Sequence, residues 1–370
     1  MKKAIFMLLF GNNIYITGAC IAAHIHRQFI KKYDLDIDLV LMIDKSINIE
    51  YGNELKKFFN RIIEIDLFIL KLHSDYLLLG KYQWLKYALN KWQILKFTEY
   101  DKILFIDIDV LPIDNKLYNV FELETPSFIC QGLNELREIK KEELLDNIEI
   151  DNYSKIAQKL KRIITASFIL LKPDINLYND FFKNFVPLCE GKDGYISNNH
   201  SGPDETTLLL YYMFYKNIKC YFIPYNYSVV PWEKFPYDKE KVYSIDYLSW
   251  IKPWTKIPII GWDDEIIWYN IAKKLFKKSK KLYELQLDIY IEELLNYINY
   301  INSNYNAKKP KYNLEYKNDD RLEKIIEKSK NTDLLKLKYI NKYKIIKYLE
   351  KNKELKLLID NSIIYKILKY

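Results

Sequence analysis

The sequence is poor in cysteine, and the four cysteines that it has are far apart. Cys20, Cys130, Cys189 and Cys220 form no Cys-x-x-Cys pair. Zinc sites and the disulfide frameworks of small secreted proteins need closely or regularly spaced cysteines. Neither kind of site is therefore predicted, and a reducing compartment, the cytoplasm, is the simpler expectation.

Long apolar runs are also missing. No uninterrupted apolar run of about 18 or more residues occurs, so no transmembrane segment is predicted. Near the start, Lys2 and Lys3 precede the apolar run Ala4–Phe10, a charge pattern shared with secretory signals. The sequence Gly-Asn-Asn ends that run early, which favours a buried first strand over a signal.

Glycine and proline are scarce, with 9 Gly and 11 Pro in 370 residues, whereas hydrophobic residues make up 49%. A chain of this length and apolar content can bury one large core, which argues against a disordered or fibrous protein. The net charge of +8 is unevenly placed, since 18 Lys and Arg stand against 9 Asp and Glu from Ser303 onward. That tail carries +9 and leaves about −1 for the rest. No nucleic-acid-binding core is therefore predicted, although the basic tail remains able to contact an acidic partner or a membrane surface.

Short apolar runs alternate with helix-like stretches along the first half of the chain. The runs predict buried parallel strands at Ala4–Phe10, Ile37–Ile43, Ile62–Ile65, Ile103–Ile106 and Phe168–Leu171. The stretches between them predict helices at Thr17–Lys32, Glu54–Phe59, Tyr82–Phe97 and Leu177–Phe185. Such alternation predicts an α/β fold, in which a mostly parallel sheet is covered by helices.

The C-terminal part differs in composition from the part before it. Residues 303–320 are polar and contain Lys-Lys-Pro, which predicts a linker. Residues 321–370 place apolar side chains at helical spacing among lysines, which predicts a basic helical tail. With a helical extension at 276–302, the α/β domain is expected to cover residues 1–275.

Two acids one residue apart, Asp107 and Asp109, end the apolar run Ile103–Ile106. Side chains two residues apart on a strand point to the same side, so the two carboxylates are expected to lie together. Close carboxylates repel each other unless a positive charge lies between them. Mg²⁺ and Mn²⁺ prefer oxygen ligands and bridge to phosphates. A metal site is one interpretation, and a polar strand end that caps a turn is the other.

Five ordered blocks between residues 4 and 255 carry a family resemblance. They read AIFMLLFGNNIYITGA from Ala4, NKW from Asn90 leading to the acid pair, ITASFILLKP from Ile164, PDETTLL from Pro203 and DYLSWIKPW from Asp246. Together they resemble glycosyltransferase family 8, most of all glycogenin-type enzymes. The resemblance implies a GT-A type, Rossmann-like fold and a nucleotide-sugar donor.

The resemblance also implies roles for individual residues. Tyr15 would stack on the donor base, and Lys252 would neutralise the leaving diphosphate. The implied donor-binding residues are Leu9, Asn12, Tyr15, Lys91, Ile108, Thr165, Lys252 and Trp254. The implied metal ligands are Asp107, Asp109 and Asp246, and the implied catalytic residues are Asp204, Glu205 and Lys252. Ordinary structural roles stay open beside these, for example helix capping by Asp204 and Glu205.

Five positions depart from the family pattern. Gly11 stands where a threonine is usual, Thr165 replaces an asparagine and Ser167 a glycine. Glu205 replaces a glutamine, and Asp246 replaces the metal-binding histidine. A carboxylate can ligate Mn²⁺ or Mg²⁺ as an imidazole can, so Asp246 remains a candidate ligand.

The expected function is that of a metal-dependent retaining glycosyltransferase. The expected donor is a UDP-sugar, with glucose as the hexose, the expected cofactor is Mn²⁺ or Mg²⁺, and the acceptor is a protein, glycan or lipid. A nucleotide-sugar-binding protein that has lost catalysis and a UDP-sugar hydrolase are the alternatives. A homodimer is an open alternative for the oligomeric state.

Overall fold

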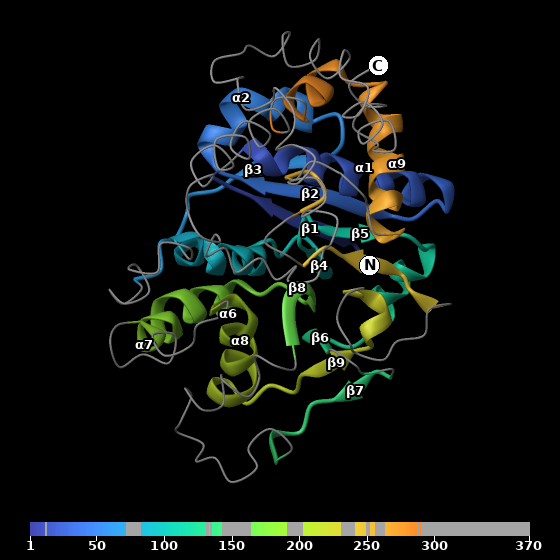
Figure 1. Ribbon diagram of the computed structural model, residues 1–370. Coiled ribbons are helices and arrows are strands. Elements are labelled where there is room, and N and C mark those ends of the chain that lie inside the picture. The colour runs from blue at the N-terminus through green and yellow to red at the C-terminus, as the bar shows by residue number, and fades with distance from the viewer. Residues whose placement is uncertain are drawn as a thin grey trace, which may run out of the picture. The chain divides into compact units, whose positions relative to one another are not determined.

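A buried sheet organises the first of two compact units, Met1–Leu248 and Ser249–Tyr370 (Figure 1). The structure is a computed structural model. It describes residues 1–11, 13–71, 83–130, 133, 135–142, 164–190, 203–230, 241–248, 252–255, 263–286 and 289. The predicted domain boundaries after residues 275, 302 and 320 stay predictions, and the predicted linker and basic tail lie outside the described residues.

Eight strands of the described residues form one sheet, in the order β3-β2-β1-β4-β8-β6-β9-β7. Their bounds are β1 Lys3–Leu9, β2 Ile37–Ile43, β3 Arg61–Glu64, β4 Lys102–Ile106, β6 Ser127–Cys130, β7 Arg137–Glu138, β8 Ile164–Leu171 and β9 Tyr221–Ile223. Strands β3, β2, β1 and β4 are parallel neighbours, as are β6 and β9. The predicted α/β fold with a mostly parallel sheet is confirmed.

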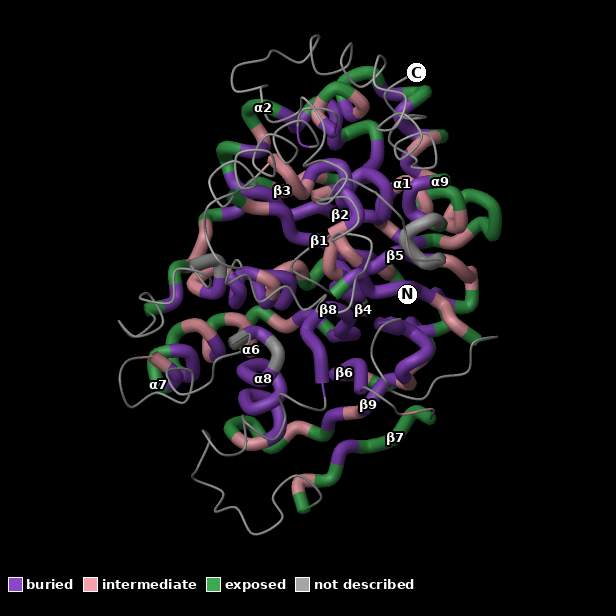
Figure 2. Tube along the Cα trace, viewed as in Figure 1, coloured by how far each residue is buried: buried purple, intermediate pink, exposed green. Residues whose placement is uncertain are grey.

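Burial explains why the apolar runs became strands. Every residue of β8 is buried, and so are Ala4–Leu9 of β1, whereas both residues of the edge strand β7 are exposed (Figure 2). A strand buried on both faces needs apolar side chains at every position rather than at alternate ones. The expectation of a buried first strand is therefore confirmed.

One strand prediction needs correction. The run that contains Phe168–Leu171 was expected to be parallel, but β8 runs antiparallel to both β4 and β6. Apolar content reports burial and carries no information on strand direction. Because of its direction, β8 begins at the sheet edge where β1 and β4 end. Thr165 and Ser167 consequently lie at that edge.

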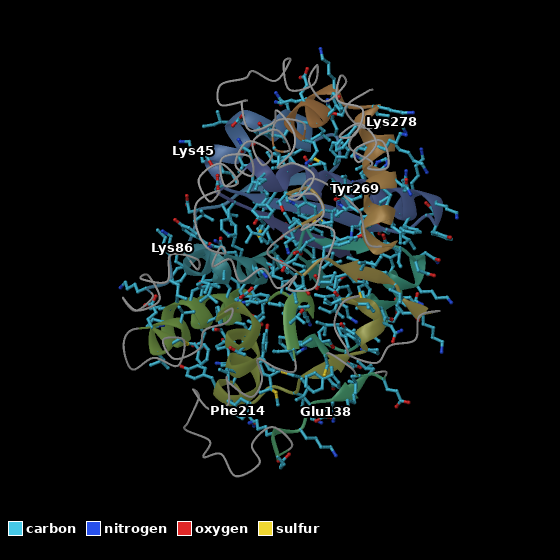
Figure 3. All side chains as sticks on the ribbon, in the orientation of Figure 1. Lys45, Lys86, Glu138, Phe214, Tyr269 and Lys278 are labelled. Atoms are coloured by element: carbon cyan, nitrogen blue, oxygen red, sulfur yellow. The ribbon has the colours of Figure 1, made fainter. Side chains whose placement is uncertain are left out.

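Helical segments connect and cover the strands. Their bounds are η1 Asn13–Tyr15, α1 Ile16–Lys32, α2 Lys45–Leu55, η2 Gln83–Lys96, η3 Asn115–Glu122, α6 Ile175–Asp180, η4 Phe181–Phe185, α7 Val186–Cys189, α8 Pro203–Leu210, η6 Tyr211–Tyr215 and η7 Tyr225–Tyr227. The helix expected at Glu54–Phe59 is wrong, because α2 begins at the exposed Lys45 (Figure 3) and ends at Leu55. Phe58 and Phe59 are buried in the turn that follows, which explains the apolar signal there.

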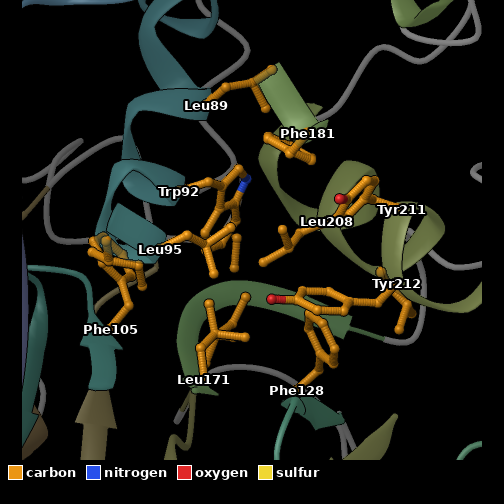
Figure 4. Packing of buried hydrophobic residues seen from close by; sticks show 14 of the residues in the cluster. Leu89, Trp92, Leu95, Phe105, Phe128, Leu171, Phe181, Leu208, Tyr211 and Tyr212 are labelled. Carbon is orange, nitrogen blue, oxygen red and sulfur yellow. The ribbon is translucent and has the colours of Figure 1, made fainter. Parts of the chain in front are cut away.

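The main apolar cluster lies where η2, α8 and β8 meet (Figure 4). Trp92 of η2 is fully buried and its ring contacts Phe105 of β4, with centroids 6.0 Å apart. Leu208 of α8 and Leu171 of β8 are also fully buried in this cluster. Burying a large side chain of this kind is worth about 1.5–3 kcal/mol. The cluster therefore fixes η2 and α8 against the sheet.

Within the second unit, α9 (Asp263–Phe276) packs on the residues before it. Trp254 is fully buried, with its ring 5.7 Å from that of Trp268. The Tyr269 hydroxyl donates to the carbonyl of Pro253, and Gln286 Nε2 donates to the carbonyl of Trp254. None of the helices that the structure describes is both long and apolar enough to cross a membrane.

Candidate functional site

The two acids of the DxD sequence lie where β4 ends and the chain turns into β5 (Val110–Pro112). The Asp107 amide donates to the carbonyl of Ser167 on β8 at 2.8 Å. The Val110 amide donates to the carbonyl of Asp107 at 3.0 Å, which closes the turn. Strand β8 and this turn therefore hold Asp107 at the edge of the sheet where ligands bind in open α/β folds.

Asp246 reaches the same turn through a small second sheet. Strand β10 (Ser244–Asp246) pairs antiparallel with β5, and Asp246 stands opposite Val110. The Tyr247 amide donates to the carbonyl of Asp109 at 2.9 Å. All three acids predicted as metal ligands thus come from one turn and the strand paired with it.

Lys91 joins two acids that come from different elements. Its ammonium group lies 2.9 Å from Asp107 Oδ2 and 2.7 Å from Asp204 Oδ2. The Lys91 side chain is 13% exposed and that of Asp204 is 4% exposed. Asp204 lies in the first turn of α8, which packs on η2. Three residues taken from two separate sequence blocks therefore meet in one largely buried ion-pair set.

The ion pairs control the charge of these groups. Burial lowers the pKa of Lys91, but the carboxylates of Asp107 and Asp204 outweigh it and hold the pKa well above its usual value. For Asp107, burial raises the pKa and the Lys91 ammonium lowers it, while Asp109 and Asp204 raise it again; the result is a pKa of about 6. Lys91 is consequently a permanent cation that keeps a crowded group of carboxylates together.

A chain of hydroxyl groups leads to Asp246. The Ser167 hydroxyl donates to Asp246 Oδ2 at 2.6 Å, and the Ser228 hydroxyl donates to the same oxygen at 3.3 Å. Thr165 Oγ1 lies 2.6 Å from Ser167 Oγ, whose own proton goes to Asp246, so Thr165 is the donor in that pair. All four side chains are buried. Donors of this kind are what a buried carboxylate needs in order to stay ionised.

Asp107, Asp109 and Asp246 have the ligand chemistry that a divalent cation takes, and they lie on one turn and the strand paired with it. Carboxylate oxygens are the ligands that Mg²⁺ and Mn²⁺ take. In the part of the chain that the structure describes, however, no three His, Cys, Asp or Glu side chains are grouped as metal ligands. Asp107 faces Lys91 and Asp246 faces two serines. Metal ligation by Asp107, Asp109 and Asp246 therefore stays a prediction.

The remaining predicted residues are placed as follows. Leu9 ends β1 and is buried, Tyr15 and Ile108 are half-buried, and Thr165 is buried on β8. Asn12 and the Glu205 side chain lie outside the described residues. Lys252 and Trp254 belong to the second unit, where the Lys252 amide donates to Thr255 Oγ1 at 2.9 Å. Their contacts with a donor stay predictions.

One acid at this edge was missed by the sequence reasoning. Asp44 directly follows β2 and is 8% exposed, and its carboxylate accepts hydrogen bonds from the Gly11 amide and from α2. The sequence pattern that singled out Asp107, an acid directly after an apolar run, is also present at Asp44.

Comparison with known proteins gives a partial sequence match. No family model matches the chain. An uncharacterized protein of Acanthamoeba polyphaga mimivirus is 30% identical over 186 residues, which are 48% of this chain and 58% of that protein. Glycogenin of Komagataella phaffii is 28% identical over 140 residues, 37% of this chain and 32% of the yeast protein. The resemblance to glycogenin is confirmed. The chain spans less than two thirds of the length of either relative.

Likeness to solved structures is remote. The galactosyltransferase LgtC, solved with donor and acceptor sugar analogues, has a TM-score of 0.43 at 15% identity, covering 73% of this chain and 95% of LgtC. The bifunctional glycosyltransferase WbbM has a TM-score of 0.44 at 13% identity, covering 76% of this chain and 51% of WbbM.

Proposed function

We propose that the chain is a metal-dependent retaining glycosyltransferase of family 8. It transfers a hexose, glucose in the first instance, from a UDP-sugar to a separate protein, glycan or lipid. The single observation that carries this proposal is the pair of ion pairs made by Lys91, at 2.9 Å to Asp107 and 2.7 Å to Asp204. These residues were selected from two sequence blocks as donor-binding, metal-binding and catalytic, and their meeting at one sheet edge supports a common site.

In the proposed mechanism, the protein's lysines stabilise the leaving diphosphate. Lys91 and Lys252 would supply positive charge where negative charge develops, which is the usual largest contribution to such catalysis. A divalent cation, when bound, would neutralise the same phosphates. Asp204 and Glu205 would lie beside the sugar, and Lys91 holds the Asp204 carboxylate in place. Departure of the diphosphate with entry of the acceptor from the same face is the preferred route.

A covalent sugar intermediate on Asp204 or Glu205 is the second route, by analogy with retaining glycosidases. The two routes differ in an observable way. Rapid quenching with a UDP-sugar and no acceptor would show a mass increase of one hexose on the protein only if a covalent intermediate forms. Replacing Asp204 would abolish that adduct if Asp204 were the nucleophile.

The test of the proposed function is a screen of nucleotide sugars with Mn²⁺, following donor consumption with and without candidate acceptors. Acceptor-dependent release of UDP is expected. Equal release in water alone would identify a hydrolase, and tight binding without any release would identify a binding protein. Intact-mass measurement after incubation tests self-modification at the same time, since a separate acceptor predicts an unchanged protein mass.

Direct metal binding is tested without turnover. The signal of free Mn²⁺ in electron paramagnetic resonance falls as the ion is bound, so a titration counts bound ions. Wild-type protein with UDP should bind Mn²⁺, and the Asp107→Asn and Asp109→Asn variants should bind it at least about tenfold more weakly. Unchanged binding in both variants would remove these two acids from the metal site.

A further inference from the structure

Asp44 lies beside the loop in which the nucleotide pocket is expected. It follows β2 directly, and β2 pairs with β1 so that Ile43 stands opposite Leu9. The loop after Leu9 leads through Gly11 to η1, which contains Tyr15. Asp44 is therefore placed at the same sheet edge as Asp107, two strands away from β4.

The two carboxylate oxygens of Asp44 have different partners. Oδ2 accepts a 2.6 Å hydrogen bond from the Gly11 amide. Oδ1 accepts from the Ile47 amide at 3.1 Å, which caps α2, and from the Ser46 hydroxyl. Burial raises the pKa of Asp44, but the hydrogen bonds from Ser46, Gly11 and Ile47 outweigh it and leave the pKa below its usual value. The side chain is thus an ionised carboxylate shared between a helix cap and a loop.

The loop conformation depends on Gly11. Its φ of +70° lies in the left-handed region, which costs a glycine nothing and other residues some strain. The same loop is tied to α2 a second time, because Asn13 Nδ2 donates to Glu50 Oε2 at 2.9 Å. The N-cap of α2 and a residue in the middle of that helix therefore support the segment between β1 and α1 at two points, and Asp44 provides the buried one.

We infer that Asp44 is a positioning residue for the donor nucleotide. Asp44 holds the turn at Gly11 and thereby fixes the conformation of the loop that carries Leu9 and Tyr15. The inference rests on the proposed function, since it assigns the loop to a uridine nucleotide. Asp44 acts through the loop and touches no reacting group.

A carboxylate is needed here for a simple reason of counting. Three donors, from Gly11, Ile47 and Ser46, converge on two oxygens. Asparagine offers one acceptor oxygen, so Asp44→Asn can cap α2 or hold Gly11 but not both. Serine caps helices well but its short side chain serves only the cap. Asp44→Ser therefore separates helix capping from loop positioning.

The experiment measures UDP binding by titration calorimetry at fixed MnCl₂, together with steady-state kinetics. Asp44→Ser should raise the Kd for UDP and the KM for the donor about tenfold, equivalent to about 1.4 kcal/mol. Asp44→Asn should raise both to the extent that its single acceptor oxygen caps α2 instead of holding Gly11. The kcat at saturating donor should change less than about twofold, because the lost interaction acts on binding rather than on the transition state. If Asp44 had a purely structural role, its replacement would lower the melting temperature but would not raise KM while leaving kcat unchanged.

Two matched controls accompany the variants. Asp174 caps α6 through hydrogen bonds to the amides of Asn176 and Leu177, so Asp174→Ser repeats the same substitution at an ordinary cap. Ser46→Ala removes one donor on Oδ1 and leaves the Gly11 contact in place. Both controls should bind UDP as the wild type does.

The outcomes separate the inference from the proposed function. If the wild type binds UDP and both Asp44 variants bind it equally well, the inference is wrong and the proposed function stands. If the wild type does not bind UDP, the proposed function fails and the inference fails with it. Should the Asp44 variants not fold, Gly11→Ala decides, because an added Cβ meets no atom within 4 Å and only the left-handed turn is strained. A raised Kd in that variant supports the inference, and an unchanged Kd overturns it.

Discussion

Replacing Lys91 with methionine tests the ion-pair set directly. Methionine keeps an unbranched chain of similar reach and removes only the charge and its hydrogen bonds. The Asp204 side chain is 4% exposed and would be left buried without its cation, whereas Asp107 is 28% exposed and can recruit water. Removing one partner of a buried ion pair costs about 3–5 kcal/mol. The free energy of unfolding of Lys91→Met should therefore fall by about that amount at neutral pH.

The size of this loss should depend on pH. In the folded wild type the pKa of Asp107 is about 6, above its unfolded value, so stability decreases as pH rises through this range. Lys91 lowers the pKa of Asp107, and its removal would raise that pKa further. Stability of the variant should consequently fall more steeply with pH than that of the wild type. The difference should be largest near pH 8 and smallest near pH 4, where Asp107 is protonated in both folded proteins.

Urea unfolding followed by circular dichroism, in buffer with EDTA, measures the effect at about pH 4.5 and 7.5. Lys96→Met is the matched control, because Lys96 lies on the same element η2 and bonds to Gln93 Oε1 at 2.7 Å rather than to an acid. Its cost should stay below about 1 kcal/mol. The ion-pair reasoning would be refuted if Lys91→Met lowered the free energy of unfolding no more than Lys96→Met does, or by the same amount at both pH values.

Two other predictions follow from the acids of this edge. Asp107→Asn and Asp109→Asn should each lower Mn²⁺-dependent donor turnover by about 100-fold or more. The circular dichroism spectrum should be retained, because each change removes a negative charge from a crowded group of carboxylates. Wild-type rates in both variants would exclude the metal assignment. In a double-mutant cycle, Ser167→Ala and Asp246→Ala should show a coupling energy of about 1.5–3 kcal/mol in unfolding experiments, the range for a hydrogen bond to a charged group. Additive losses would show that the 2.6 Å contact contributes nothing to stability.

The sheet was predictable to the extent that burial alone defines its strands. The run Ile37–Ile43 is apolar except for the partly exposed Asp38 because both faces of the strand are covered, and β2 has those bounds in the structure. The apolar pattern predicts neither the direction of a strand nor the presence of very short strands. β5 and β10 have three residues each, and β10 begins with a serine and ends with an aspartate. Their pairing depends on tertiary contacts that a local pattern does not encode.

The sequence singled out individual residues for the candidate site but gave no information on their contacts. The order of the sequence blocks selected Lys91, Asp107 and Asp204, and the structure brings these three together. The sequence alone assigned Lys91 to the donor and gave no indication that it bridges two acids. Asp44 escaped notice because a single acid after a strand is common at helix starts, where it caps the helix.

The departures from the family pattern take on a different meaning once their contacts are known. Taken singly, Ser167 for glycine, Asp246 for histidine and Thr165 for asparagine count as three unrelated departures from the pattern. In the structure they form one buried set, in which Thr165 donates to Ser167 and Ser167 donates to Asp246. A buried carboxylate in place of an imidazole needs an additional donor, and a glycine could not supply one. The three replacements are therefore a single compensated change.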